Sequence, residues 1–180
     1  MPDAARHLTL AELEAGLDAI RRSPRAAGKV DMIVRRPSVN EREVLESANL
    51  DPELGLVGDR WSAGNRRGAQ LTLMNSRVIE LLAQERARWP LAGDQLYVDL
   101  DLSVDNVAPG TRLAVGDALI EVIAEPHMPC GKFRARYGVD AFTFVNSQSG
   151  TGLQLRGINA RIVAGGEVRA GAAVRKVPSP

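Results

Sequence analysis

Residues 112–124, Arg-Leu-Ala-Val-Gly-Asp-Ala-Leu-Ile-Glu-Val-Ile-Ala, predict a β-hairpin. Two apolar runs flank Gly116-Asp117, a pair of residues typical of tight turns between antiparallel strands. Further short apolar runs predict strands at 30–35, 70–74, 95–100, 159–163 and 174–177. Many short strands with glycine turns, and no regular alternation of strand and helix, favour a mainly β fold, a barrel or sandwich decorated by helices.

Helical patterns are fewer. Residues 8–22 predict an amphipathic helix with Thr9 as its N-cap and Glu12 in capping-box spacing. Ser76 is expected to cap a second helix over 77–89, which Pro90 would end. A short helix is expected at 133–137 and a helical turn at 43–49, whereas 142–145 fits helix or strand equally well.

The composition indicates one soluble globular domain. The chain has 180 residues, 44% of them hydrophobic, but only 4% are aromatic, so the core must be largely aliphatic. We expect an N-terminal helical extension at 1–29, packed on the domain, and the β domain itself at 30–177. The acidic N-terminus does not resemble a secretory signal, and a single cysteine fits a reducing compartment, so a cytoplasmic location is expected.

Cys130 is the only cysteine, which excludes a disulfide within one chain. Pro126 and Pro129 stiffen the approach to it, and Gly131 leaves the backbone beside it uncrowded. Nearby basic residues would favour the thiolate, the form that attacks electrophiles and binds soft metals. A buried, inert cysteine is the alternative, and the residues alone do not separate the two.

The charges are segregated although the net charge is only +1. Segments 21–43 and 130–161 each carry a net charge of +4, whereas segment 99–125 carries −5. Two basic segments would form an anion site if the fold brings them together, and would otherwise be solvated faces. Arg156 and Arg161 are candidates because forked guanidinium donors suit phosphate or carboxylate, and Gly157 between them allows close backbone approach.

Several classes of site are disfavoured. One cysteine and two histidines make no zinc pattern, and neither a phosphate loop nor a dinucleotide fingerprint is present. A Cys130–His127 hydrolase is weakly supported, since residues three apart in an extended segment point to opposite faces. Sparse aromatic residues argue against nucleic acid as a partner, and no apolar run has the length to span a membrane.

Taken in order, several segments resemble the MOSC domain family, named for the C-terminal domain of molybdenum cofactor sulfurase. The matching segments are Gly-Leu-Val-Gly-Asp-Arg at 55–60, Leu-Thr-Leu-Met-Asn at 71–75, Val-Gly-Asp at 115–117, Pro-Cys-Gly-Lys-Phe at 129–133, Arg-Gly-Ile-Asn-Ala-Arg at 156–161 and Gly-Gly-Glu-Val-Arg-Ala-Gly at 165–171. They span about residues 30–177 and look most like the short, stand-alone bacterial members.

This resemblance implies a β-barrel in which Cys130 faces a molybdenum cofactor of the molybdopterin type or carries sulfur. Cys130 would be the catalytic residue and the molybdenum ligand, in reduction of N-hydroxylated or N-oxide compounds with electrons from a separate donor. The residues expected to hold the cofactor are Arg35, Arg36, Arg60, His127, Lys132, Arg156, Asn159 and Arg161. His127 stands where family members often carry arginine.

The resemblance leaves other functions open. Cys130 could hold a persulfide for assembly of metal–sulfur cofactors, which would make a cysteine desulfurase the partner, because nothing in this chain resembles the pyridoxal-phosphate domain of the sulfurases. The third possibility is an anion-binding module without chemistry, in which Cys130 merely packs.

Overall fold

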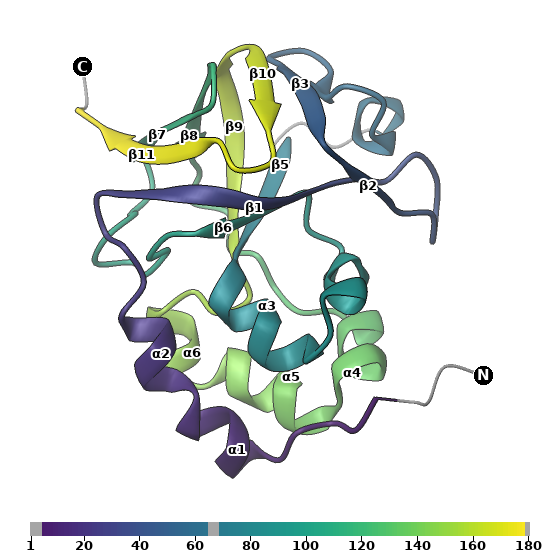
Figure 1. The fold of residues 1–180 in the computed structure, drawn as a ribbon, viewed down its shortest axis with the longest axis vertical. Helices are drawn as coiled ribbons and strands as arrows, with labels where there is room; N and C mark the ends of the chain where they lie inside the picture. The colour runs from purple at the N-terminus through teal and green to yellow at the C-terminus, as the bar shows by residue number, and fades with distance from the viewer. Residues whose placement is uncertain (1–4, 65–68, 179–180) are drawn as a thin grey trace.

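The computed structural model describes residues 5–64 and 69–178. The strands gather in one half of the molecule and most helices in the other (Figure 1). The strands are β1 (Ala27–Arg35), β2 (Glu43–Leu45), β3 (Ser47–Asp51), β4 (Gly55–Leu56), β5 (Leu71–Asn75), β6 (Leu96–Asp99), β7 (Arg112–Val115), β8 (Ala118–Val122), β9 (Ile158–Ala164), β10 (Gly166–Arg169) and β11 (Ala173–Val177). The helices are α1 (Leu10–Ala15), α2 (Leu17–Arg21), α3 (Ser76–Ala83), α4 (Gly131–Tyr137), α5 (Val139–Asn146) and α6 (Gln148–Gly152), with 3₁₀ helices η1 (Arg60–Ala63) and η2 (Arg86–Ala92).

The main sheet closes into a barrel. Its strands follow the order β11-β7-β8-β9-β5-β6-β1, and β1 also pairs with β11, which joins the two ends. β2 extends the sheet beside β1, while β10, β3 and β4 form a small second sheet. β5 and β6 run parallel with α3 and η2 as their crossover, and the other barrel pairs are antiparallel. The expected β-barrel with helical decoration is therefore confirmed.

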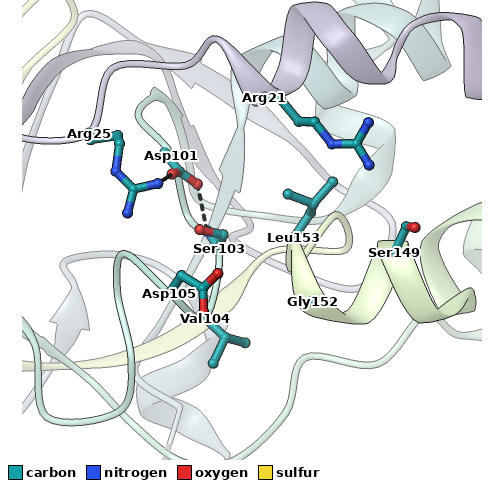
Figure 2. A pocket seen from close by; sticks show the side chains of 9 residues that line it. All are labelled: Arg21, Arg25, Asp101, Ser103, Val104, Asp105, Ser149, Gly152 and Leu153. Carbon is teal, nitrogen blue, oxygen red and sulfur yellow. Dashed lines mark hydrogen bonds and ion pairs between the residues drawn. The ribbon is translucent and has the colours of Figure 1, made fainter.

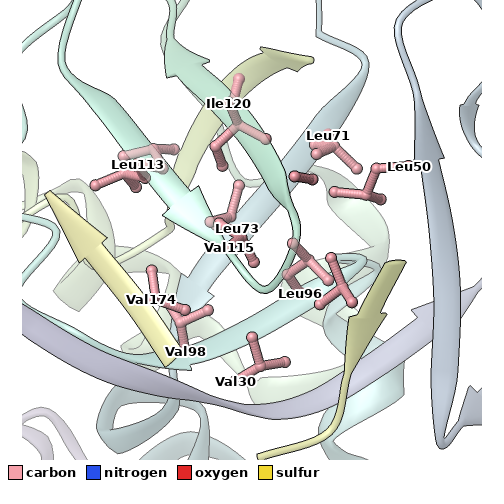
Figure 3. Packing of buried hydrophobic residues seen from close by; sticks show 14 of the residues in the cluster. Val30, Leu50, Leu71, Leu73, Leu96, Val98, Leu113, Val115, Ile120 and Val174 are labelled. Carbon is pink, nitrogen blue, oxygen red and sulfur yellow. The ribbon is translucent and has the colours of Figure 1, made fainter. Parts of the chain in front are cut away.

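Aliphatic side chains fill the barrel, as the scarcity of aromatic residues requires. The predicted hairpin is present as β7 and β8, where alternate residues such as Leu113, Val115 and Ile120 are fully buried. They meet Leu73 of β5 and Leu96 of β6 in one cluster (Figure 3). Period-two alternation, which places every second residue inside, thus builds the core.

Three barrel strands are buried on both faces because the helices cover their outer side. Met32 on β1, Met74 on β5 and Tyr97 on β6 belong to a second cluster together with Phe133 and Phe144 of the helices. The sequences of such strands are continuous apolar runs rather than an alternation of apolar and polar residues. The helical layer therefore rests on β1, β5 and β6.

The N-terminal helical pattern forms two short helices. Thr9 caps α1 and makes the expected capping box with Glu12. Gly16 separates α1 from α2, and a Cβ there would lie 2.5 Å from Leu81, so the break permits close packing on α3. Leu13 and Ile20 are buried in the helical core, which agrees with the predicted apolar face.

Two expectations were wrong. The helix predicted over 77–89 is α3 followed by η2, because Gln84 adopts a left-handed conformation with φ of 61° that ends α3. Asn75, not Ser76, caps α3, and Pro90 lies inside η2. The helical turn predicted at 43–49 is instead the strand pair β2 and β3, because both segments find partner strands in β1 and β10. Within the described residues, no helix has the length and apolar character needed to cross a membrane.

The barrel core gives a stability prediction from two neighbours on β8. Ile120 is fully buried, whereas Leu119 faces the other side of the strand and is only partly buried. Ile120→Ala should lower the free energy of unfolding by about 2–4 kcal/mol, through lost burial plus a cavity. Leu119→Ala should cost about 1 kcal/mol or less. Urea unfolding measures both, and equal losses would contradict the inward orientation of Ile120.

Candidate functional site

The end of η2 is the centre of a group of arginines. Carbonyl groups in the last turn of a helix lack the partners that a further turn would supply, and such oxygens carry partial negative charge. Here Pro90 O accepts from the Gly93 N–H at 3.2 Å. Four consecutive carbonyls each accept a hydrogen bond from a different arginine: Arg42 Nε to Pro90 O (3.3 Å), Arg136 Nη1 to Leu91 O (2.6 Å), Arg156 Nη2 to Ala92 O (3.0 Å) and Arg36 Nη1 to Gly93 O (3.1 Å). We call these four residues the arginine cluster.

Positive charge exceeds negative charge in the arginine cluster. Arg36 forms a forked ion pair with the buried Asp59, at 2.8 and 2.9 Å. No carboxylate pairs with Arg42 or Arg136 among residues 5–64 and 69–178. Burial lowers the pKa of Arg42, and the charges of Arg136, Arg36 and Arg60 lower it further. The cluster is therefore an uncompensated cationic site, built by the two basic segments noted in the sequence.

Arg156 is buried and held by Asp94. Its Nη1 donates to Asp94 Oδ2 at 2.7 Å, and its guanidinium lies 5.0 Å from the centre of the Phe133 ring. Within the described part of the chain, Arg156 Nε and Asp94 Oδ1 are buried without a hydrogen-bond partner. Asp94 thus fixes the position of Arg156, while both side chains keep unused hydrogen-bonding capacity.

His127 lies against this pair. Its Nδ1 is 3.3 Å from Asp94 Oδ1 and 3.5 Å from Arg156 Nη1. Burial lowers the pKa of His127 to about 4; the charges of Arg156 and Arg36 act in the same direction, and Asp94 opposes them. His127 is therefore neutral near pH 7 and adds no charge to the cluster.

Cys130 precedes α4 as its N-cap residue, and it is exposed. Partial burial raises the pKa of its thiol, but the backbone N–H groups of Phe133 and Lys132 and the charges of Arg156 and Arg136 lower it. The net result is a pKa below that of an ordinary cysteine. The exposure of Cys130 rules out the buried cysteine that was the alternative, and its lowered pKa increases the fraction of thiolate at a given pH.

The remaining residues expected at the site have different surroundings. Lys132 donates to Asn40 Oδ1 at 3.2 Å, which ties the start of α4 to the loop that carries Arg42. Asn159 is buried and donates to Glu125 O at 3.1 Å, so it anchors the segment leading to His127. The backbone N–H of Arg60 donates to the Arg36 carbonyl.

Arg35 and Arg161 do not join the arginine cluster. Arg35 pairs with Glu43 at 2.6 Å across β1 and β2. Arg161 pairs with Glu121 at 2.9 Å across β8 and β9, with about half of its side chain exposed. Gly157 does allow a close backbone approach, with φ of +108°, but its neighbour is the carbonyl of Leu73 on β5.

Comparison with known proteins identifies the family. The model of the MOSC domain family matches residues 66–175. The chain belongs to the MOSC domain family. No curated protein gives a significant match.

Solved structures support the MOSC fold. One crystal structure, of a hypothetical protein, is 23% identical in sequence to this chain. The alignment covers 89% of this chain and 71% of that protein, with a TM-score of 0.63. YuaD from Bacillus subtilis is 15% identical, with coverages of 82% and 94% and a TM-score of 0.59. YiiM from Escherichia coli is 23% identical, with coverages of 83% and 70% and a TM-score of 0.55. At these sequence identities, the similarity is evidence for a shared fold alone.

Sequence reasoning missed three parts of this MOSC site. Asp94 and Arg42 lie in loops and belong to no recognised motif, and Arg42 was noted only as part of the basic segment 21–43. Arg136 was noted only as a basic neighbour of Cys130. Asp94 lies in a Gly-Asp-Gln segment just before β6, where the chain enters the barrel. That position could have pointed to Asp94, because an acidic residue that becomes buried needs a basic partner.

Two clefts lie elsewhere on the MOSC domain. One has a volume of about 420 Å³, and Arg21, Arg25, Asp101 and Asp105 are among its lining residues (Figure 2). The other, of about 500 Å³, lies between β1, α3 and η2. Cys130 borders neither cleft. Within the described residues, no group of three or more His, Cys, Asp or Glu side chains is placed to hold a metal ion.

The position of His127 predicts a pH effect on stability. Its pKa is about 4 in the folded protein against 6.5 for an ordinary histidine, so between these values the unfolded chain binds more protons. The free energy of unfolding should therefore fall as the pH falls from 6.5 to 4, by about 3 kcal/mol from this residue. NMR titration of the histidine ring protons, assigned with His7→Gln, measures the pKa directly. A value at or above 6.5 for His127 would contradict the buried, cation-facing ring.

Proposed function

We propose that this MOSC domain binds a pterin-type molybdenum cofactor, with Cys130 as the metal ligand and the arginine cluster as the site for its anionic groups. One observation carries the proposal: an exposed cysteine with a lowered pKa is under the influence of two guanidinium groups, and one of them, Arg136, has no carboxylate partner among the described residues. Membership of the MOSC family adds support to this assignment.

The residues fit the chemistry of such a cofactor. A thiolate is a soft ligand of the kind that suits a metal bound to sulfur, whereas guanidinium forks suit phosphate oxygens. The buried Nε of Arg156 is a donor without a partner in the described structure, which a bound anion would satisfy. Bound there, the cofactor would supply the redox centre for reduction of N-hydroxylated or N-oxide compounds.

The residues of the chain would bind and orient the cofactor. Arg42 and Arg136 would attract the anion, because no carboxylate neutralises them among the described residues. Asp94 holds Arg156 through Oδ2, and Phe133 supports the guanidinium from the side, so little rearrangement would be needed on binding. His127 is a neutral ring at the wall of the site, able to exchange hydrogen bonds without adding charge. Electrons would come from a separate donor.

Molybdenum content tests this proposal. Protein purified from a molybdate-fed host should contain molybdenum and oxidisable pterin, and Cys130→Ser should lose most of the metal. Arg136→Gln should retain less pterin, because it removes an unpaired cation. Arg169→Gln, which changes an exposed arginine paired with Glu167, is the matched control and should equal the wild type. Metal that is absent from the wild type, or equal in Cys130→Ser, would refute the assignment.

A sulfur carrier is the second candidate, favoured by a specific observation. The Cys130 side chain is exposed at the start of α4, so another protein has access to the sulfur. A persulfide there would also be stabilised by the cations of Arg136 and Arg156. In this role the partner would be a cysteine desulfurase or another source of sulfur.

A further inference from the structure

The excess of cations beside Cys130 indicates that an anionic ligand binds near its sulfur atom. Arg42 and Arg136 have no carboxylate partner in the described chain, and Arg156 is buried with an unpartnered Nε. Arg136 and Arg156 are also the two cations that act on the Cys130 thiol. Several guanidinium groups gathered around one point suit a small oxoanion with more than one negative charge.

An exposed thiolate beside an oxoanion site suits a particular reaction. A thiolate attacks a sulfur that is bonded to another sulfur when the second sulfur departs as part of a good leaving group. Thiosulfate has two features that would suit this site. Its outer sulfur is open to attack by the thiolate, and its leaving group is a dianionic oxoanion that the arginines could bind. In bulk water the approach of two anions is disfavoured, and the arginine cluster would offset that repulsion.

We propose that Cys130 takes its sulfur from thiosulfate or a related oxoanionic sulfur donor bound at the arginine cluster. The inference rests on the second candidate function, the sulfur carrier. The Cys130 thiolate attacks the outer sulfur, a new S–S bond forms, and the S–S bond of thiosulfate breaks. The electron pair leaves with sulfite, so Cys130 becomes a persulfide and no oxidant or reductant is consumed.

The site matches the needs of this transfer. Sulfite leaves as an anion and requires no proton, which agrees with a neutral His127 and with arginines that do not release protons. Because Cys130 is exposed, sulfite can depart and a small acceptor can take the sulfur from the persulfide. Asp94 holds one of the cations in place through the 2.7 Å contact with Arg156.

Intact mass spectrometry of the full-length, reduced protein tests the proposal. After incubation with thiosulfate, the wild type should gain one sulfur atom, and Cys130→Ser should gain none. Addition of cyanide should remove that sulfur and release one thiocyanate per persulfide. Sulfate should slow loading more than chloride at the same ionic strength, because it competes for the oxoanion site.

The arginine cluster is tested separately. Arg136→Gln should slow loading at least about tenfold, because attraction of a charged ligand falls with each cation removed. Arg136→Lys should recover part of the rate, and Arg169→Gln should load like the wild type. Circular dichroism on each variant verifies folding. Loading of Arg136→Gln at the wild-type rate would overturn the role of the cluster.

A second sulfur source separates the inference from the function on which it rests. If thiosulfate fails to load Cys130 but a cysteine desulfurase with cysteine succeeds, the proposed donor is wrong and the carrier function stands. If both fail, the carrier function and the inference are both refuted.

Discussion

Carbonyl oxygens at the end of η2 need hydrogen-bond donors, and four arginines from separate parts of the chain supply one to each of residues 90–93. Pro90 O also accepts from the Gly93 N–H. Arg36 follows β1, Arg42 precedes β2, Arg136 lies on α4, and Arg156 precedes β9. Unpaired carbonyls in a protein interior are costly, so this requirement draws four segments to one point. The barrel, the helical layer and the loop before β2 meet there, beside the only cysteine.

Gathering like charges is unfavourable unless something offsets their repulsion. The carbonyl groups offset part of it, and the buried carboxylates of Asp59 and Asp94 neutralise Arg36 and Arg156. Arg42 and Arg136 remain without carboxylate partners in the described chain. Burial is the main cause of the lowered pKa values of Arg42 and His127, and repulsion from nearby arginines adds to it. Sites that retain unfavourable electrostatics are often functional, because a bound ligand of opposite charge relieves them.

Much of the fold could be predicted from local pattern. The hairpin of β7 and β8 follows from alternation and a Gly-Asp turn, and the capping box at Thr9 from its spacing. Patterns failed where tertiary packing decided the outcome. Residues 43–49 became strands because β1 and β10 offered pairing partners, and α3 ended at Ala83 because Gln84 adopts a left-handed conformation. Local propensity is weak against such contacts.

The site was less accessible to sequence reasoning. Cys130 and Arg156 were singled out from their residue types and Arg36 through the family resemblance, but what joins the arginines is the run of carbonyls at 90–93, which leaves no trace in residue types. Arg161 resembled Arg156 in the sequence, yet it lies on β9 directly opposite Glu121 of β8 and pairs with that carboxylate. Asp94 and Arg42 became visible only through their contacts.

The central claim is that the arginine cluster acts on the sulfur of Cys130. The most direct measurement is the rate of alkylation of Cys130 by iodoacetamide as a function of pH. The wild type should show a thiol pKa below the ordinary value of 9.0, Arg136→Gln should shift it upward, and Arg169→Gln should leave it unchanged. A wild-type pKa at or above 9.0, or one that Arg136→Gln does not move, would contradict the account.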